Sequence, residues 1–178
     1  MPDDHFLPTR QHTLERWAQG LARGTPAPGG GAAAAVTLAL AAALVEMVAR
    51  MTLDRPRYAP VHTEMKQAAQ AAEELRERLL YLAGEDAQAV ATKRGTVETQ
   101  VELAARARAV AQLARRVAES GHAPARGDAI MAAVLAAAVA RGAAINVAIN
   151  RGDQAESAGR DAEAAEQEAG IVRTIIPP

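Results

Sequence analysis

Apolar side chains recur at helical spacing along most of this chain, and no stretch alternates apolar and polar residues as a half-buried strand does. The segment after Val61 is an example. Its apolar stripe is formed by Met65, Ala68, Ala69, Ala72, Leu75 and Leu79, and its polar face by Glu73, Glu74, Arg76, Glu77 and Arg78. The pattern predicts an all-α protein.

Capping residues and glycines set the expected helix boundaries. The predicted helices are Thr13–Arg23 with Thr13 as N-cap, Ala32–Leu53, Val61 onward, Thr96–Ser120, Asp128–Asn150 and a surface helix within Asp153–Gly170. The third is expected to continue past Gly84, since one glycine costs only about 1 kcal/mol inside a helix. We therefore expect a single-domain bundle of five to six helices over 1–178, with an N-terminal extension (1–12) and a surface helix and apolar tail (153–178).

Two of these helices are almost entirely apolar. The run Ala32–Val45 contains one polar residue, Thr37, and a similar run follows Asp128. Fourteen alanine-rich residues are fewer than the roughly 20 that a membrane span needs, and Glu46 and Arg50 follow at once. We expect two central, buried helices packed side by side, and no membrane span.

Alanine accounts for 46 of the 178 residues. A buried methyl group contributes only about 0.8 kcal/mol, against roughly 1.5 to 3 kcal/mol for a leucine side chain, so the core is thin. Close helix packing and self-association are the available compensations. We therefore expect a homodimer.

The remaining composition narrows the function classes. A net charge of -1 and only four aromatic residues disfavour nucleic-acid binding. The chain has no cysteine, and its four histidines (His5, His12, His62 and His122) lack metal-ligand spacing, so no metal site is expected. The sequence begins MPDDHFLPTR, which does not resemble a signal peptide, and a cytoplasmic protein is expected.

The segment Thr25–Gly31, TPAPGGG, directly precedes a predicted helix. Glycines at a helix start leave backbone N–H groups open to a ligand, and the helix dipole adds partial positive charge there. The alternative is a stiff turn that lets two helices pack closely. The segment is neither a P-loop nor a Rossmann fingerprint.

A second group of candidate residues lies on the last apolar helix. Asn146 and Asn150 share a face at i, i+4 spacing and, if buried, need a ligand or another polar partner. The alternative is that they face water. Asp128 could be only an N-cap and Asp86 only an exposed carboxylate. Asp128 and Asn146 are 18 residues apart, about 27 Å along a helix, so one ligand cannot touch both within one chain.

Several segments together resemble the formiminotransferase-cyclodeaminase C-terminal family, which includes formimidoyltetrahydrofolate cyclodeaminase and methenyltetrahydrofolate cyclohydrolase. The matching segments are LERWAQGLARG, TPAPGGGAAAA, MVARMT, EDAQA around Asp86, and GDAIMAAVLAAAVARGAAINVAIN, spanning about residues 13 to 150. The resemblance implies an all-α, dimeric enzyme that uses a tetrahydrofolate derivative as substrate and binds no cofactor tightly.

The resemblance also suggests roles for individual residues. Asp86 and Asp128 are the candidate acid and base, Pro28, Gly29, Gly30 and Gly31 the ligand cradle, and Asn146 and Asn150 orienting amides. By charge alone, Lys93, Arg55, Arg57 and Arg141 are candidates for the folate carboxylate.

Two reactions and one non-catalytic alternative follow. The enzyme would hydrolyse 5,10-methenyltetrahydrofolate to 10-formyltetrahydrofolate or cyclodeaminate 5-formiminotetrahydrofolate. The alternative is a non-catalytic helical dimer of the same fold that binds a small ligand or a protein partner.

Overall fold

The computed structural model describes residues 10–150 and 153–174 and is all-α over that part of the chain. Its helices are α1 (Leu14–Leu21), α2 (Gly30–Leu53), α3 (His62–Thr92), α4 (Thr96–Ser120), α5 (Arg126–Ile149) and α6 (Ala155–Thr174). Two short 3-10 helices, η1 (Pro56–Val61) and η2 (Ala123–Ala125), precede α3 and α5. The expected helix number and class are confirmed.

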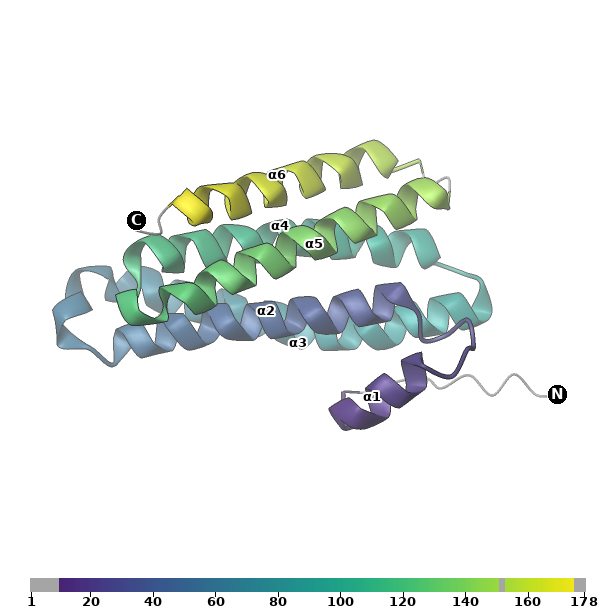
Figure 1. The fold of residues 1–178 in the computed structure, drawn as a ribbon, viewed down its shortest axis with the longest axis horizontal. Helices are drawn as coiled ribbons and strands as arrows, with labels where there is room; N and C mark the ends of the chain where they lie inside the picture. Colours follow the sequence, from purple (N-terminus) through teal and green to yellow (C-terminus); the bar gives the residue numbers. More distant parts are fainter. Residues whose placement is uncertain (1–9, 151–152, 175–178) are drawn as a thin grey trace.

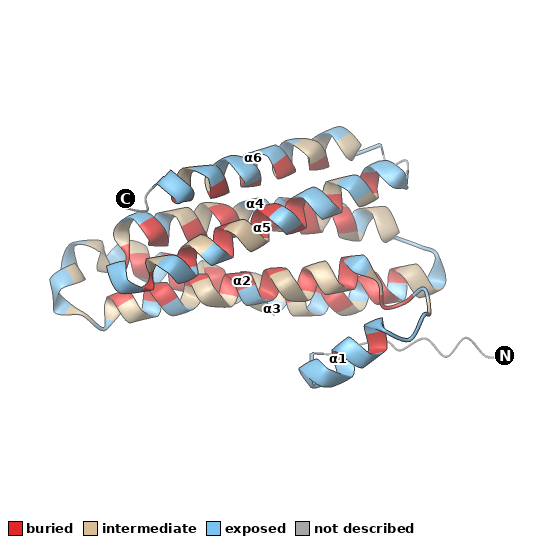
Figure 2. Cartoon of the chain, in the orientation of Figure 1, coloured by how far each residue is buried: buried red, intermediate tan, exposed pale blue. Residues whose placement is uncertain are grey.

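Helices α2 to α6 run up and down in a bundle, and α1 lies beside it (Figure 1). Consecutive long helices are antiparallel, so the start of α2, the end of α3, the start of α4 and the end of α5 meet at one end of the bundle. The buried residues follow the inward faces of the helices (Figure 2). The core is mostly alanine, with Leu38, Met65, Leu79, Leu82 and Leu103 as its largest fully buried side chains.

The two alanine-rich helices, α2 and α5, pack against each other as predicted. Both are long and apolar enough to cross a membrane by length and composition, but half or less of each apolar window is buried within the chain. The expectation that neither spans a membrane stays a prediction.

Several boundaries differ from the sequence prediction. Helix α2 begins at Gly30 rather than Ala32, with Gly29 as its N-cap in an extended conformation. Helix α5 begins at Arg126, so Ala125 is its N-cap and the N-cap role considered for Asp128 is wrong. Helix α3 continues through Gly84, as predicted.

The two termini were only partly predictable. Thr13 caps α1, its Oγ1 accepting a hydrogen bond from Arg16 N at 3.2 Å. Helix α6 extends to Thr174, so the apolar segment after Gly170 begins as helix, and Val172 is buried. The rest of that tail (175–178) and most of the N-terminal extension (1–9) lie outside the described residues.

Candidate functional site

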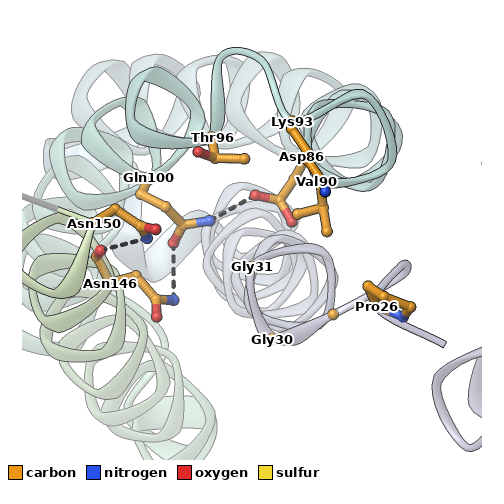
Figure 3. A pocket seen from close by; sticks show the side chains of 11 residues that line it. Pro26, Gly30, Gly31, Asp86, Val90, Lys93, Thr96, Gln100, Asn146 and Asn150 are labelled. Atoms are coloured by element: carbon orange, nitrogen blue, oxygen red, sulfur yellow. Dashed lines mark hydrogen bonds between the residues drawn. The ribbon is translucent and has the colours of Figure 1, made fainter. Parts of the chain in front are cut away.

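A cavity of about 410 Å³ lies where the four helix ends meet (Figure 3). Its size suits a drug-sized or cofactor-sized ligand. It is lined by Pro26, Gly29, Gly30, Gly31, Asp86, Val90, Lys93, Thr96, Gln100, Asn146 and Asn150. The cavity therefore brings together most of the residues that the sequence singled out.

Asp86 is the buried carboxylate of this cavity, only 2% exposed. Its Oδ1 accepts hydrogen bonds from Thr99 Oγ1 at 3.0 Å and from Gln100 Nε2 at 2.6 Å. Its Oδ2 is buried and has no hydrogen-bond partner within the described residues. Because buried carboxylate oxygens normally have partners, Oδ2 is available to a ligand group or a proton. The exposed-carboxylate alternative for Asp86 is wrong.

Gln100, which the sequence analysis missed, connects the carboxylate to the asparagines. Its Nε2 donates to Asp86, and its Oε1 accepts from Asn146 Nδ2 at 3.3 Å (Figure 3). Asn150 Nδ2 in turn donates to the backbone oxygen of Asn146 at 2.8 Å. A sequence signal existed: Gln100 occupies the buried stripe of α4 continued by Leu103, a position where a polar side chain needs a partner.

The glycine segment both lines the cavity and permits close packing. A Cβ atom at Gly31 would lie 2.5 Å from both carboxylate oxygens of Asp86 and closer still to Gln100 Nε2. A Cβ at Gly30 would meet nothing within 4 Å. Only glycine at 31 therefore lets α2 begin against the carboxylate. The close-packing interpretation is therefore confirmed at Gly31. The ligand-binding role of the segment stays a prediction, and Pro26 rather than Pro28 lines the cavity.

Within residues 10–150 and 153–174, one acidic and one basic side chain line the cavity, Asp86 and Lys93. Lys93 ends α3 in the left-handed conformation, with φ of 57°, and is exposed at the rim. The N-terminus of α2 adds partial positive charge at Gly30 and Gly31. The site thus combines a buried anionic group with a polar, partly cationic rim.

Comparison with known proteins identifies the family of this chain. The formiminotransferase-cyclodeaminase family profile matches residues 13–94 and 91–169. A methenyltetrahydrofolate cyclohydrolase from Methylorubrum extorquens is 35% identical, over 78% of each chain. This chain belongs to the formiminotransferase-cyclodeaminase family. The crystal structure of formiminotetrahydrofolate cyclodeaminase from Thermotoga maritima is also similar, with a TM-score of 0.82, 26% identity and coverage of 93% of each chain.

The other candidate carboxylate of this family member lies elsewhere. Asp128 is exposed in the first turn of α5, at the end opposite to Asn146, and does not line the cavity. Within one chain, Asp86 and Asp128 are not brought together. A catalytic role for Asp128 stays a prediction.

Of the four cations suggested for a folate carboxylate, only Lys93 lines the cavity. Arg141 pairs with Glu166 at 3.7 Å on the outer surface. Arg55 directly precedes η1 and Arg57 lies within it, at the opposite end of the bundle. No group of three or more His, Asp or Glu side chains among residues 10–150 and 153–174 is placed to hold a metal ion. The expected absence of a metal remains a prediction.

Proposed function

We propose that this protein is a folate one-carbon enzyme that hydrolyses 5,10-methenyltetrahydrofolate to 10-formyltetrahydrofolate, with the cavity around Asp86 as its active site. Support for the reaction comes from the cyclohydrolase relative, which shares 35% identity over 78% of each chain. The observation that carries the site assignment is the buried Asp86 Oδ2, which lacks a partner and lines the cavity.

Charge complementarity supports this substrate. The methenyl bridge between N5 and N10 of the folate is a formamidinium cation. A carboxylate 2% exposed, with one oxygen unused, attracts such a cation more strongly than it would in water. Lys93 is then available at the rim for the glutamate carboxylate of the folate, and the amides of Asn146 and Asn150 for polar atoms of the pterin.

The proposed reaction needs one proton carrier close to the bridge carbon. The oxygen of water bonds to that carbon while Asp86 Oδ2 accepts a proton, giving a tetrahedral carbon. The bond from this carbon to N5 then breaks, and N5 receives a proton. Of the two protons of the water, one ends on N5 and the other is released. Among the described residues, Asp86 is the only carboxylate that lines the cavity, so it performs both transfers.

Gln100 has a positioning role in this scheme. It holds Asp86 Oδ1 at 2.6 Å, which leaves Oδ2 as the free atom, and its own oxygen is held by Asn146. Since both ends of this amide are bonded, the carboxylate cannot rotate without breaking a hydrogen bond. The reactive oxygen is therefore oriented before substrate binds.

The experiment is turnover of 5,10-methenyltetrahydrofolate by the purified protein, followed by loss of its near-ultraviolet absorbance against a matched reaction without enzyme. Acceleration that depends on Asp86 supports the proposal. If the folded protein does not raise the rate above that of the reaction without enzyme, cyclohydrolase activity is excluded.

The similarity to the Thermotoga maritima cyclodeaminase favours a second candidate reaction, cyclodeamination of 5-formiminotetrahydrofolate. There N10 attacks the formimino carbon and ammonia leaves, so the same carboxylate would protonate the leaving nitrogen. Ammonia release from this substrate separates the two reactions. Binding of folate with turnover of neither substrate would favour the non-catalytic alternative.

We also propose that the protein acts as a homodimer without a tightly bound cofactor. The homodimer is supported by the alanine-rich core and by apolar side chains left exposed on α2 and α5.

A further inference from the structure

Thr99, in the first turn of α4, has a hydroxyl group that lies close to two acceptors. Its Oγ1 is 3.0 Å from Asp86 Oδ1 and 3.1 Å from the backbone oxygen of Thr96. A threonine hydroxyl carries one proton, so it donates a full hydrogen bond to one of these oxygens at a time. The direction of this hydrogen bond can therefore change while all three residues stay in place.

The charge of Asp86 decides between the two acceptors. A hydrogen bond to an ionised carboxylate is roughly twice as strong as one to a neutral oxygen. While Asp86 is charged, the Thr99 hydroxyl therefore donates to Oδ1. Once the carboxyl group has taken up a proton, Oδ1 is a neutral acceptor, and the backbone oxygen of Thr96 competes with it from nearly the same distance.

Gln100, the second donor to Asp86 Oδ1, is held at both ends. Its Nε2 lies 2.6 Å from Oδ1, and its Oε1 accepts from Asn146 Nδ2 at 3.3 Å (Figure 3). Turning this amide would break both hydrogen bonds. Gln100 thus keeps the carboxyl group in place in both of its charge states, whereas Thr99 stabilises mainly the charged state.

The proton that Asp86 takes up in the proposed reaction goes to its other oxygen. Oδ2 is buried and has no hydrogen-bond partner within residues 10–150 and 153–174, while Oδ1 already accepts two hydrogen bonds. With the proton on Oδ2, Oδ1 is the carbonyl oxygen of the acid and still accepts from Gln100. The Thr99 hydroxyl is then the donor that can turn away.

The charged groups around Asp86 are few. Among the described residues, the side chains that line the cavity from α2, α4 and α5 are uncharged. On α3 itself, Lys93 is exposed at the rim, and Glu85 pairs with Arg78 at 2.8 Å. Because these groups and the N-terminus of α2 stay the same when Thr99 is changed, the effect of its hydroxyl on Asp86 can be measured separately.

We propose that Thr99 is a positioning residue that tunes how strongly Asp86 holds a proton: its hydroxyl donates to the charged carboxylate and turns to the Thr96 backbone oxygen once Oδ2 is protonated. This inference rests on the function proposed above, in which Asp86 takes a proton from water and passes one to N5. A base that holds its proton too strongly is a poor acid in the second transfer. By stabilising the anion, Thr99 favours the release of that proton.

The first test is the pH dependence of kcat/KM in Thr99→Val, which keeps the shape of the side chain and removes the hydroxyl. Because hydrolysis releases a proton, the interconversion of 5,10-methenyltetrahydrofolate and 10-formyltetrahydrofolate is followed in whichever direction runs at each pH. The acid limb of the profile is expected to move up by about one pH unit, since a hydrogen bond to a charged group is lost. Turnover below the midpoint of the limb then falls about tenfold, while turnover at pH 8 changes less than about threefold.

Two further variants separate the hydroxyl from the fold. Thr99→Ser keeps a hydroxyl and is expected to keep the wild-type limb. Thr92→Val is the matched control, because the Thr92 hydroxyl also lies between two acceptors, the backbone oxygens of Gln88 at 2.9 Å and Ala89 at 3.4 Å, and neither belongs to a carboxylate. This control should not move the limb. If Thr99→Val loses turnover equally at every pH, the role of Thr99 is only structural and the inference is overturned.

A second readout does not depend on turnover. Carbon-13 NMR of the side-chain carboxyl groups follows the titration of Asp86, whose signal is identified by its absence from Asp86→Asn. The titration midpoint is expected to be about one pH unit higher in Thr99→Val, and equally in Thr99→Ala, than in the wild type and Thr99→Ser. Equal midpoints would overturn the inference. A shifted midpoint in a protein that turns over neither folate would refute the proposed function and leave the effect of Thr99 on Asp86 standing.

Discussion

The two ends of the bundle both contain buried polar groups, but they use them differently. At the end with η1 and η2, Thr52 Oγ1 accepts a hydrogen bond from His122 N at 2.8 Å and donates to Val48 O at 2.7 Å. Tyr58 stands edge-on to the His122 ring and accepts from Ala123 N at 3.1 Å. These bonds tie two loops together.

The cavity end keeps one group unsatisfied. Asp86 Oδ2 is buried without a partner in the described residues, beside a glycine that no larger residue can replace without a clash. Leaving a buried acceptor unpaired costs about 1–3 kcal/mol, which a purely structural contact would not require. The comparison indicates that a buried polar group whose hydrogen bonds are all made has a structural role. A buried acceptor without a hydrogen-bond partner instead indicates a candidate site for binding or catalysis.

The strongest test of this contrast is Asp86→Asn. The amide cannot accept a proton as the carboxylate does, so we expect turnover to fall by about 10² to 10⁴-fold while the fold is kept. Absorbance assays and circular dichroism on the same preparation measure the two effects. Turnover close to that of the wild type would rule out a catalytic role for Asp86.

Asp128→Asn is the matched change at the opposite end of α5, where the carboxylate is exposed. If Asp128 acts only from its own chain, where it does not line the cavity, turnover will change less than about threefold, roughly 0.6 kcal/mol of activation free energy. A loss as large as that of Asp86→Asn would instead mean that a second subunit brings Asp128 to the cavity.

Gly31→Ala should have the next largest effect. Its Cβ would enter the space of the Asp86 carboxylate, so we expect a loss of about 1–3 kcal/mol in unfolding free energy, together with reduced turnover. Urea denaturation measures the first. The control is Gly30→Ala, whose Cβ meets nothing within 4 Å and which should stay close to wild type. Equal behaviour of the two variants would contradict the described packing.

Thr52→Val tests the end of the bundle with η1 and η2, where the buried polar groups have hydrogen-bond partners. It keeps the shape of the side chain but leaves the buried His122 N–H without its acceptor, so we expect about 1–3 kcal/mol lower stability and unchanged turnover. Thr63→Val, at an exposed position in the first turn of α3, is the control. Lost turnover at full stability would show that the two ends are not independent.

The smallest expected effect is a pH dependence of stability. Burial, with the nearby charges of Arg55 and Arg57, lowers the pKa of His122 below 6.5. The unfolded chain therefore binds a proton more readily, and the stability from neutral His122 is lost as pH falls from about 6.5 through the lowered pKa. Melting temperatures of wild type and His122→Gln between pH 8 and 5 should converge toward low pH. A constant difference would contradict this assignment.

The cavity illustrates what could be inferred before any coordinates. Gly29 to Gly31, Asn146 and Asn150 were singled out because glycines before a helix and amides on an apolar helix are locally unusual. Asp86 was singled out through the family resemblance and Lys93 by its charge alone. Gln100 was overlooked, since a single glutamine in a polar helix is common. Its importance depends on which face of α4 turns inward.

The sequence by itself determined the helices, their approximate ends and the pair of apolar helices at the centre, because helix propensity, capping and 3.6-residue periodicity are local properties. Only the tertiary structure decided that Asp86, Gln100 and Asn146 meet, and that Pro26 rather than Pro28 faces the cavity. The reason is physical: hydrogen bonds between residues 14 and 46 positions apart depend on how antiparallel helices align, and no local pattern encodes that alignment.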